Sequence, residues 1–361
     1  MMRIGSVNLA SPFAIAPMAG MTDSAFRRLV KRHGGCGLVV TEMVSSEGLV
    51  RGIDRTLEYA EYTEEERPIA IQIFGGDPAK MADAAQIVEN MGADIVDVNM
   101  GCPVPKIAKH NAGCSLMREP VHAASVIRAM TKAVKIPVTV KMRAGWNDAD
   151  RNAPILAQMV EGAGAAAVAV HGRTAEQSYS GSADWDLVAR VAEALTIPVF
   201  GSGDCVEPDQ IVERMRSGIE GVLVGRGVLR NPWILAQAQD LTAGGPARHV
   251  TLEDRGRFLL DYIDLLLEER TRGVEADRAG AASHDRWVVN KLRALGAYFT
   301  KGLDNGSHVR ALINASPSLA DLQQIILQFF AGDSGRDAGC SGGPNPAELM
   351  VGSQQVREMT Q

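Results

Sequence analysis

The chain has 361 residues, of which 46% are apolar and 22% charged, as in an ordinary globular protein with one large domain or a large and a small one. Its formal net charge of −6 argues against a basic surface over the whole chain, although a local basic patch stays open. The five cysteines include no C-x-x-C pair, so neither a disulfide framework nor a zinc site is indicated and we expect no metal. We recognise no signal peptide and no apolar run of membrane length, and therefore expect a cytoplasmic protein without a membrane partner.

Eight short apolar runs, each followed by a helical or connecting segment, predict eight strands in alternation with helices. They lie at 13–17, 38–41, 69–73, 95–98, 136–140, 166–170, 197–200 and 221–224. Such alternation predicts an α/β fold of the (β/α)8, or TIM, barrel type. The alternative is an open doubly wound sheet, which usually has fewer strands and a Gly-rich first turn. The first turn here, Pro17-Met-Ala-Gly20, is not G-x-G-x-x-G. The acidic stretch from Glu58 to Arg67 is interpreted as a surface connection.

The character of the chain changes after residue 242. Ala243-Gly-Gly-Pro246 is a linker, and from Leu252 to Phe330 helical periodicity replaces the strand pattern. Residues 333–361 are rich in Gly, Ser and Asp and have little apolar content, which predicts a disordered tail. We therefore expect a barrel over 1–242, a small all-helical domain over 247–332 and a tail over 333–361.

The stretch from Asp97 to Lys106 stands out because a buried strand ends in it abruptly at Gly101. Cys102 follows on a loop that Pro103 and Pro105 keep out of helical conformation. A free cysteine is more often a small apolar core residue. The polar and conformationally special neighbours of Cys102 favour the other interpretation, in which the loop presents the thiol to a ligand.

Polar and charged residues gather at the carboxyl ends of the predicted strands, the face on which barrels carry their active sites. Gly201-Ser-Gly203 and Gly225-Arg-Gly227 follow the seventh and eighth strands, where barrels commonly bind a phosphate. A single G-x-G is only a tight turn in many proteins. Two of them on neighbouring strands, one with a cation, favour a cofactor that bears a phosphate. The residues at these ends are Gln72, Cys102, Lys141, His171, Arg173, Asp204 and Arg226.

Six strings in the same order as the predicted strand ends resemble the tRNA-dihydrouridine synthases, most closely the bacterial B-type subgroup. They are Ala-Pro-Met-Ala-Gly (16–20), Ile-Gln-Ile-Phe-Gly (71–75), Asn-Met-Gly-Cys-Pro-Val-Pro-Lys (99–106), Val-Lys-Met-Arg (140–143), His-Gly-Arg-Thr (171–174) and Val-Gly-Arg-Gly (224–227). The resemblance covers about residues 5 to 330. It implies an FMN-dependent barrel with a helical domain that helps to hold tRNA, and reduction of the C5–C6 bond of a tRNA uracil with NADPH as the electron donor.

The resemblance also implies roles for individual residues. Cys102 is the expected proton donor to C5. The flavin ring is expected to contact Pro17, Met18, Ala19, Gln72, Lys141 and His171, and its phosphate Ser202, Gly203, Asp204, Gly225 and Arg226. Asn99, Lys106, Arg143 and Arg173 are expected near the base or the RNA phosphates. The chain departs from the family pattern in two places: Ser202 stands where Asn is usual, and Cys114, which we interpret as a packing residue, stands where Ser is usual.

Between Arg278 and Arg310 the chain has six Lys or Arg residues and two acidic residues, a local excess in an acidic protein. Basic residues on a helix are often only a solvated face. The excess is nevertheless the best candidate for an RNA-facing surface, with Lys291, Arg293 and Lys301 as expected contacts. We expect a monomer. Two alternatives remain: an FMN barrel that reduces a free pyrimidine, and an RNA-binding protein without catalysis, against which Cys102, Lys141 and His171 argue.

Overall fold

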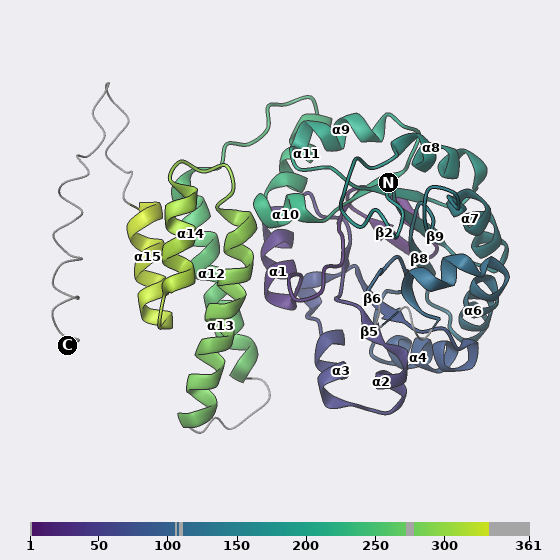
Figure 1. The fold of residues 1–361 in the computed structure, drawn as a ribbon, viewed down its shortest axis with the longest axis horizontal. Helices are drawn as coiled ribbons and strands as arrows, with labels where there is room; N and C mark the ends of the chain where they lie inside the picture. Colours follow the sequence, from purple (N-terminus) through teal and green to yellow (C-terminus); the bar gives the residue numbers. More distant parts are fainter. Residues whose placement is uncertain (1, 105–106, 108–110, 272–277, 332–361) are drawn as a thin grey trace.

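The computed structural model describes residues 2–104, 107, 111–271 and 278–331. Within them, eight parallel strands stand in the order β3-β11-β10-β9-β8-β7-β6-β4. A parallel bridge between Ala14 and Leu38 joins the two ends of this series and closes a barrel (Figure 1). The predicted (β/α)8 barrel is confirmed. The strands are β3 (Phe13–Ile15), β4 (Val39–Val40), β6 (Ile69–Phe74), β7 (Ile95–Met100), β8 (Val138–Arg143), β9 (Ala167–His171), β10 (Val199–Ser202) and β11 (Gly221–Val224).

Several strands continue beyond the apolar runs that predicted them. β7, β8, β9 and β10 end at Met100, Arg143, His171 and Ser202, two, three, one and two residues later than the runs. Ladder pairing persists through these polar residues, as in the pairing of Arg143 with His171. The polar side chains are therefore held by strands and not by loops. The two-residue strand β5 (Val44–Ser45) also pairs with the end of β6.

Helices surround the barrel, and their starts follow ordinary capping chemistry. Asp23, Asp77 and Asp184 each accept the backbone N–H three residues later. Pro78, Pro120 and Pro208 open their helices, where the missing N–H has no cost. The elements are α1 (Ser24–His33), α2 (Ser46–Val50), α3 (Asp54–Ala60), η1 (Glu64–Glu66), α4 (Pro78–Asn90), η2 (Gly113–Arg118), α6 (Pro120–Ala133), α7 (Ala153–Gly162), α8 (Trp185–Ala194), α9 (Pro208–Met215), α10 (Arg226–Arg230) and α11 (Ile234–Thr242).

A short antiparallel hairpin that the sequence did not predict closes the amino-terminal end of the barrel. It consists of β1 (Met2–Ile4) and β2 (Val7–Leu9). Ile4 and Leu9 are each 1% exposed and pack in one cluster with barrel-interior side chains such as Phe200 and Leu223. In the part of the chain that the structure describes, the lower half of the barrel interior is thus a filled apolar core, and the polar side chains of the interior lie at the carboxyl ends of the strands.

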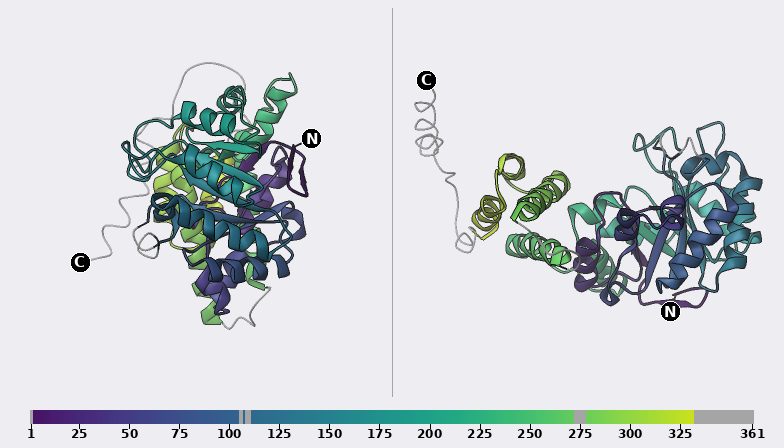
Figure 2. Two further views of the ribbon diagram at one scale, coloured as in Figure 1. Left: turned by 90° about the vertical axis from the view of Figure 1, so that its right-hand side faces the viewer. Right: turned by 90° about the horizontal axis from the view of Figure 1, so that it is seen from below.

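The helices beyond the linker form a separate bundle at one side of the barrel (Figures 1 and 2). In the described part they are α12 (Leu252–Thr271), α13 (Arg278–Phe299), α14 (Gly306–Ala315) and α15 (Leu319–Ala331). α12 packs on α1, where Phe26 meets Phe258 and Tyr262 with ring centroids 5.9 and 6.1 Å apart, and α13 packs on α10. The expected tail, 333–361, lies outside the described residues. None of the described helices combines the length and the apolarity that crossing a membrane requires.

The interpretation of 58–67 as a surface connection is wrong at Glu66. This side chain is fully buried and pairs with the equally buried Arg27 of α1, with Oε1 and Nε 2.6 Å apart. A run of acidic residues suggests a solvated segment, but one of them faces inward as the counter-charge of a buried arginine. The segment therefore anchors α1 to the barrel.

Candidate active site

The register of the barrel places polar side chains side by side at the carboxyl ends of its strands. Gln72 pairs with Asp97, and Asn99 with Lys141. Farther around the barrel, His171 pairs with both Arg143 and Ser202. Residues paired between parallel strands stand at one level, so these side chains form a continuous polar layer above the apolar core.

A chain of buried hydrogen bonds runs through this layer to the cysteine loop. Asp97 accepts from Thr139 at 2.6 Å and from Gln72 at 2.7 Å. Asn99 donates from Nδ2 to the Gln72 amide oxygen at 2.8 Å. Its own side-chain oxygen accepts the backbone N–H of Cys102 at 2.9 Å. Side chains from three neighbouring strands, β6, β7 and β8, thus form the network that fixes the loop that carries the thiol.

Asp97 is a site residue that the sequence reasoning did not name among its candidates. The carboxyl group is buried, and burial raises its pKa although Gln72 and Thr139 stabilise the charged form. The signal was present in the sequence, since an acidic residue interrupts an otherwise apolar strand. Its burial requires partners, and those partners belong to β6 and β8.

Cys102 is partly exposed at the mouth, whereas Cys114 is buried beneath it. The Cys114 N–H donates to the Cys102 carbonyl at 3.1 Å. Gly113 has a φ of 59°, and a Cβ at this position would stand 2.8 Å from the same carbonyl. Burial, with a smaller contribution from the Cys102 thiol, raises the pKa of Cys114 to about 11. The structure agrees with the interpretation of Cys114 as a packing residue and leaves Cys102 as the accessible thiol of this pair.

His171 is surrounded by positive charge. Burial, and then the charges of Lys141, Arg143, Arg173 and Arg226, together lower its pKa to about 2. The imidazole is therefore neutral at any physiological pH. Lys141 is affected in the same way, because burial and then Arg143 lower its pKa to about 8 against the opposing effect of Asp97.

Two of the arginines expected to contact substrate form hydrogen bonds to other groups of the protein. Arg143 donates from Nε to the Gly101 carbonyl at 2.8 Å, beside the cysteine loop. Its Nη1 donates to the carbonyls of Thr174 and Ser178. With an exposed fraction of 4%, Arg143 braces the loops after β7 and β9, and its place in substrate binding stays a prediction.

Arg173 is likewise buried, and it forms an ion pair with Asp204 at 2.7 Å. It also donates to the carbonyls of Ser180 and Gly181. Its Nη1 is buried and has no hydrogen-bond partner in the described part of the chain. This N–H group can therefore donate a hydrogen bond to a ligand that enters the site.

The turns after β10 and β11 are neighbours, since these two strands pair directly. Gly203 has a φ of 124°, and a Cβ there would stand 2.6 Å from Ala183 and 3.1 Å from the His171 ring. At Gly225, a Cβ would find its nearest atom 3.5 Å away, the sulfur of Met18. The first turn thus requires glycine for both conformation and space, and the second stands close to the loop after β3.

Asp204 is the acidic group among the cations of this region. It accepts the Ala183 N–H at 2.7 Å and both its oxygens face Arg173. Arg226 lies farther off, 3.8 Å from Asp204, with its guanidinium over the Tyr179 ring and 41% of its side chain exposed. Four cations against Asp97 and Asp204 leave the mouth with an excess of positive charge.

The three residues predicted to contact the flavin ring from the first strand, Pro17, Met18 and Ala19, lie on the loop between β3 and α1 and are partly or fully exposed. Thr22 holds this loop closed through a bond from the Met18 N–H at 3.0 Å. The Gly20 N–H donates to the buried Glu42 at 2.6 Å.

Of the three residues of the helical domain predicted to contact RNA, two contact other groups of the protein and one is exposed to solvent. Lys291 and Arg293 make contacts inside the protein: Lys291 with Asp23 at 2.9 Å and Arg293 with the Ser316 carbonyl at 2.8 Å. Lys301 is exposed. Lys106 lies outside the described residues. Among the residues that are described, no group of His, Cys, Asp and Glu has the arrangement of a metal site.

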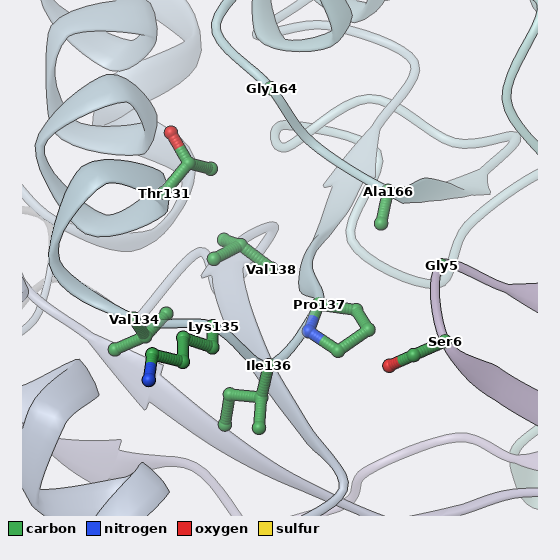
Figure 3. Close-up of a pocket in the computed structure, with 10 residues that line it drawn as sticks. All are labelled: Gly5, Ser6, Thr131, Val134, Lys135, Ile136, Pro137, Val138, Gly164 and Ala166. Atoms are coloured by element: carbon green, nitrogen blue, oxygen red, sulfur yellow. The ribbon is translucent and has the colours of Figure 1, made fainter.

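A hollow of about 260 Å³ lies at the opposite end of the barrel (Figure 3). It is lined by residues at the starts of β8 and β9, among them Pro137 and Ala166, and by Gly5 of the hairpin. Lys135 is the charged residue of its lining. The hollow contains none of the polar layer described above and does not belong to the candidate active site.

The polar layer and the cysteine loop fall within the region that a known family shares. Residues 14–319 match the family model described as dihydrouridine synthase. The chain belongs to the dihydrouridine synthase family. The sequence is 36% identical over 333 residues to a probable tRNA-dihydrouridine synthase of Rickettsia bellii, which covers 91% of this chain and 98% of the relative. It is 40% identical over 245 residues to tRNA-dihydrouridine synthase B of Xanthomonas axonopodis pv. citri, covering 68% and 74%. A probable tRNA-dihydrouridine synthase of Rhodobacter capsulatus is 44% identical over 237 residues, covering 65% and 72%.

The family resemblance inferred from the six strings is thus confirmed. Each string contains the carboxyl end of a barrel strand or begins directly after it. The roles of the individual residues stay predictions.

Proposed function

We propose that this chain is a flavin-dependent tRNA-dihydrouridine synthase, which reduces the C5–C6 bond of specific uridines in tRNA with NADPH as the electron donor. The observation that carries the proposal is Cys102, an accessible thiol fixed by Asn99 at a barrel mouth rich in positive charge. The family match over residues 14–319 and the names of the relatives support the same reaction.

The residues at the mouth fit FMN as the cofactor. A dianionic phosphate, and a ring that becomes anionic on reduction, suit the excess of cations around His171, and the Arg173 Nη1 without a partner belongs to one of these cations. When bound, FMN supplies the hydride that adds to C6 of the uracil. The ring is proposed to rest on Pro17, Met18, Ala19, Gln72, Lys141 and His171, and the phosphate on Ser202, Gly203, Asp204, Gly225 and Arg226.

Cys102 is proposed to supply the proton of the reaction. Addition of hydride at C6 leaves negative charge on C5 and on the C4 carbonyl, and a neutral thiol within hydrogen-bond reach gives its proton to C5. Asn99 orients the loop by accepting the Cys102 N–H. Because Cys102 is partly exposed, water can return the proton to the sulfur after each turnover.

Lys141 is proposed to hold a positive charge against the cofactor ring. Without a ligand, burial lowers the pKa of Lys141 to about 8, which still leaves most of the amine protonated at pH 7. An anion placed next to it raises the pKa again. A lysine poised in this way stabilises negative charge on a reduced ring more strongly than a solvated one, because water does not screen it.

The RNA is proposed to approach the same mouth. A uracil has to leave its stack before its C5 and C6 atoms can enter a barrel. Backbone phosphates then require cations, for which Lys301, exposed on the bundle, and Lys106, expected from the resemblance, are the candidates. We assign the barrel over 1–242 to flavin binding and the helices over 247–332 to tRNA, in a monomer that acts in the cytoplasm.

The experiment that tests the proposal begins with the visible spectrum of the purified protein. The protein is then incubated with NADPH and unmodified tRNA, and modified uridines are detected by mass spectrometry as a gain of 2 Da. Flavin absorbance together with the +2 Da uridine supports the proposal. Flavin with turnover of free uracil but not tRNA would replace it by a free-pyrimidine reductase. A folded protein that cannot be reconstituted with FMN would overturn it.

A further inference from the structure

Lys291 of α13 reaches out of the helical bundle and contacts the barrel. Its Nζ lies 2.9 Å from Asp23 Oδ2 and donates to the Gly20 carbonyl at 3.1 Å. Tyr262 of α12 donates to the same Asp23 oxygen at 2.7 Å. Two helices of the bundle therefore meet at one carboxylate, at the point where α1 of the barrel begins.

The segment that receives these contacts is the loop between β3 and α1. Gly20 is held from both sides, since its N–H donates to Glu42 and its carbonyl accepts from Lys291. With a φ of 80°, Gly20 turns the chain directly after Met18 and Ala19, and the Met18 sulfur lies 3.5 Å from the place of a Cβ on Gly225. The conformation of this loop thus depends on a residue that lies 271 positions away in the sequence.

Charge makes this contact strong. The side chains of Lys291 and Asp23 are 14% and 12% exposed, so solvent screens the pair only weakly. Burial lowers the pKa of Lys291, but Asp23 and Glu42 outweigh it, and the pKa is raised on balance. Lys291 also packs over the Trp287 ring, 5.4 Å from its centroid, which fixes the direction of the side chain. A lysine used in this way is a poor candidate for neutralising an RNA phosphate.

We infer that Lys291 is a positioning residue: it fixes the loop over 17–22 in the conformation that receives the cofactor ring, and so makes the helical bundle part of the flavin site. This inference rests on the proposed function. It replaces the expected role of Lys291 as an RNA contact and gives the bundle a task that does not require RNA.

Hydrogen exchange of the protein without cofactor or RNA tests the first half of the inference. In Lys291→Met, amides of the segment 16–24 are expected to exchange about tenfold faster than in the wild type, because a charge-assisted bond is lost. A strand peptide over 69–74 is expected to be unchanged. Lys291→Arg, which keeps the charge and the donors, should restore protection. Unchanged exchange of 16–24 in a folded Lys291→Met protein would overturn the inference.

The matched control is Arg257→Met in the same bundle. Arg257 forms an exposed pair with Glu253 on α12, and both side chains are about two-thirds exposed. This variant removes one cation from the bundle without touching the loop, and its exchange over 16–24 should equal that of the wild type. If Lys291→Met does not fold, Lys291→Gln, which keeps a polar donor but no charge, provides the same comparison.

FMN titration followed by flavin fluorescence tests the second half. Lys291→Met is expected to weaken FMN binding by about tenfold or more, and to slow reduction of the flavin by NADPH in the absence of tRNA. Unchanged FMN binding with a raised KM for tRNA would show an RNA contact and overturn the inference. Unchanged FMN binding with only a lower melting temperature would show a purely structural contact and overturn it as well. A wild type that binds no FMN would instead identify the proposed function as the part that failed.

Discussion

The side-chain oxygen of Asn99 accepts the backbone N–H of Cys102 at 2.9 Å, while its amide nitrogen donates to Gln72 at 2.8 Å. One buried side chain therefore joins a residue at the proposed flavin ring to the loop of the proposed general acid. Cys102 lies beyond the strand and is not held by strand pairing, because β7 ends at Met100. Asn99 holds Cys102 instead.

Asn99→Ala is expected to lower kcat by roughly tenfold to a hundredfold, because the thiol is no longer held where it can reach C5. KM for tRNA should change little, since Lys301, which we propose as a contact of the RNA backbone, lies in the helical bundle. The measurement is steady-state formation of dihydrouridine over a range of tRNA concentrations, which gives both kcat and KM. A variant with a lower melting temperature but a wild-type kcat would limit Asn99 to a structural role.

Cys102→Ala is expected to reduce the rate of dihydrouridine formation by about 10² to 10⁴, the usual contribution of a general acid. FMN binding and reduction by NADPH should be retained, because neither requires that proton. Cys114→Ser is the matched control, since it changes the buried thiol beneath the same loop. Equal loss of turnover in both variants would indicate damage to the loop and contradict the assignment of Cys102.

Glu66→Ala is expected to lower the free energy of unfolding by about 3–5 kcal/mol, because it leaves the guanidinium of Arg27 buried without its counter-charge. Glu64→Ala is the control. Glu64 is 82% exposed and pairs with Arg67, so its removal should cost less than about 1 kcal/mol. Urea unfolding of both variants gives the two values. Similar values for the two variants would contradict the prediction, because they would mean that burial does not increase the contribution of the Arg27–Glu66 ion pair to the free energy of unfolding.

The stability of the protein is expected to fall as the pH drops below the ordinary histidine range. Burial and then Arg248 lower the pKa of His33 to about 4, and the ring packs against Trp233 and Phe258. Between about pH 6.5 and 4 the unfolded chain binds a proton at this site that the folded chain does not, so the contribution of His33 is present above pH 6.5 and decreases below it.

His33→Phe removes this effect and keeps an aromatic ring. Between pH 7.5 and 5.0 the wild type should lose about 1 kcal/mol more free energy of unfolding than the variant, after allowance for solvent at a half-buried ring. Urea unfolding at both pH values is the measurement. Parallel losses in the two proteins would contradict the shift at His33, since other titrating groups are common to both.

The barrel was predictable because each of its strands is a short apolar run between turn residues, and the polar residues that follow such runs meet on one face. The hairpin of β1 and β2 was missed, since each of its strands has three residues, one of them exposed. Lys291 was predicted to contact RNA because it lies in a local excess of basic residues. The contacts on which we base a different proposal for it, with Gly20 and Asp23, arise from tertiary packing, which composition does not reveal. Glu66 was misinterpreted for the same reason.

The hairpin that fills the lower end of the barrel has a consequence for the order of events in catalysis. With Ile4 and Leu9 packed into that end, the described part of the barrel is open to a ligand at the carboxyl ends of its strands and not through its lower interior. On the proposed function, NADPH and tRNA both bind at this opening. Because both are large, we expect them to bind one after the other. The electrons that NADPH delivers are then held on the bound flavin until tRNA binds.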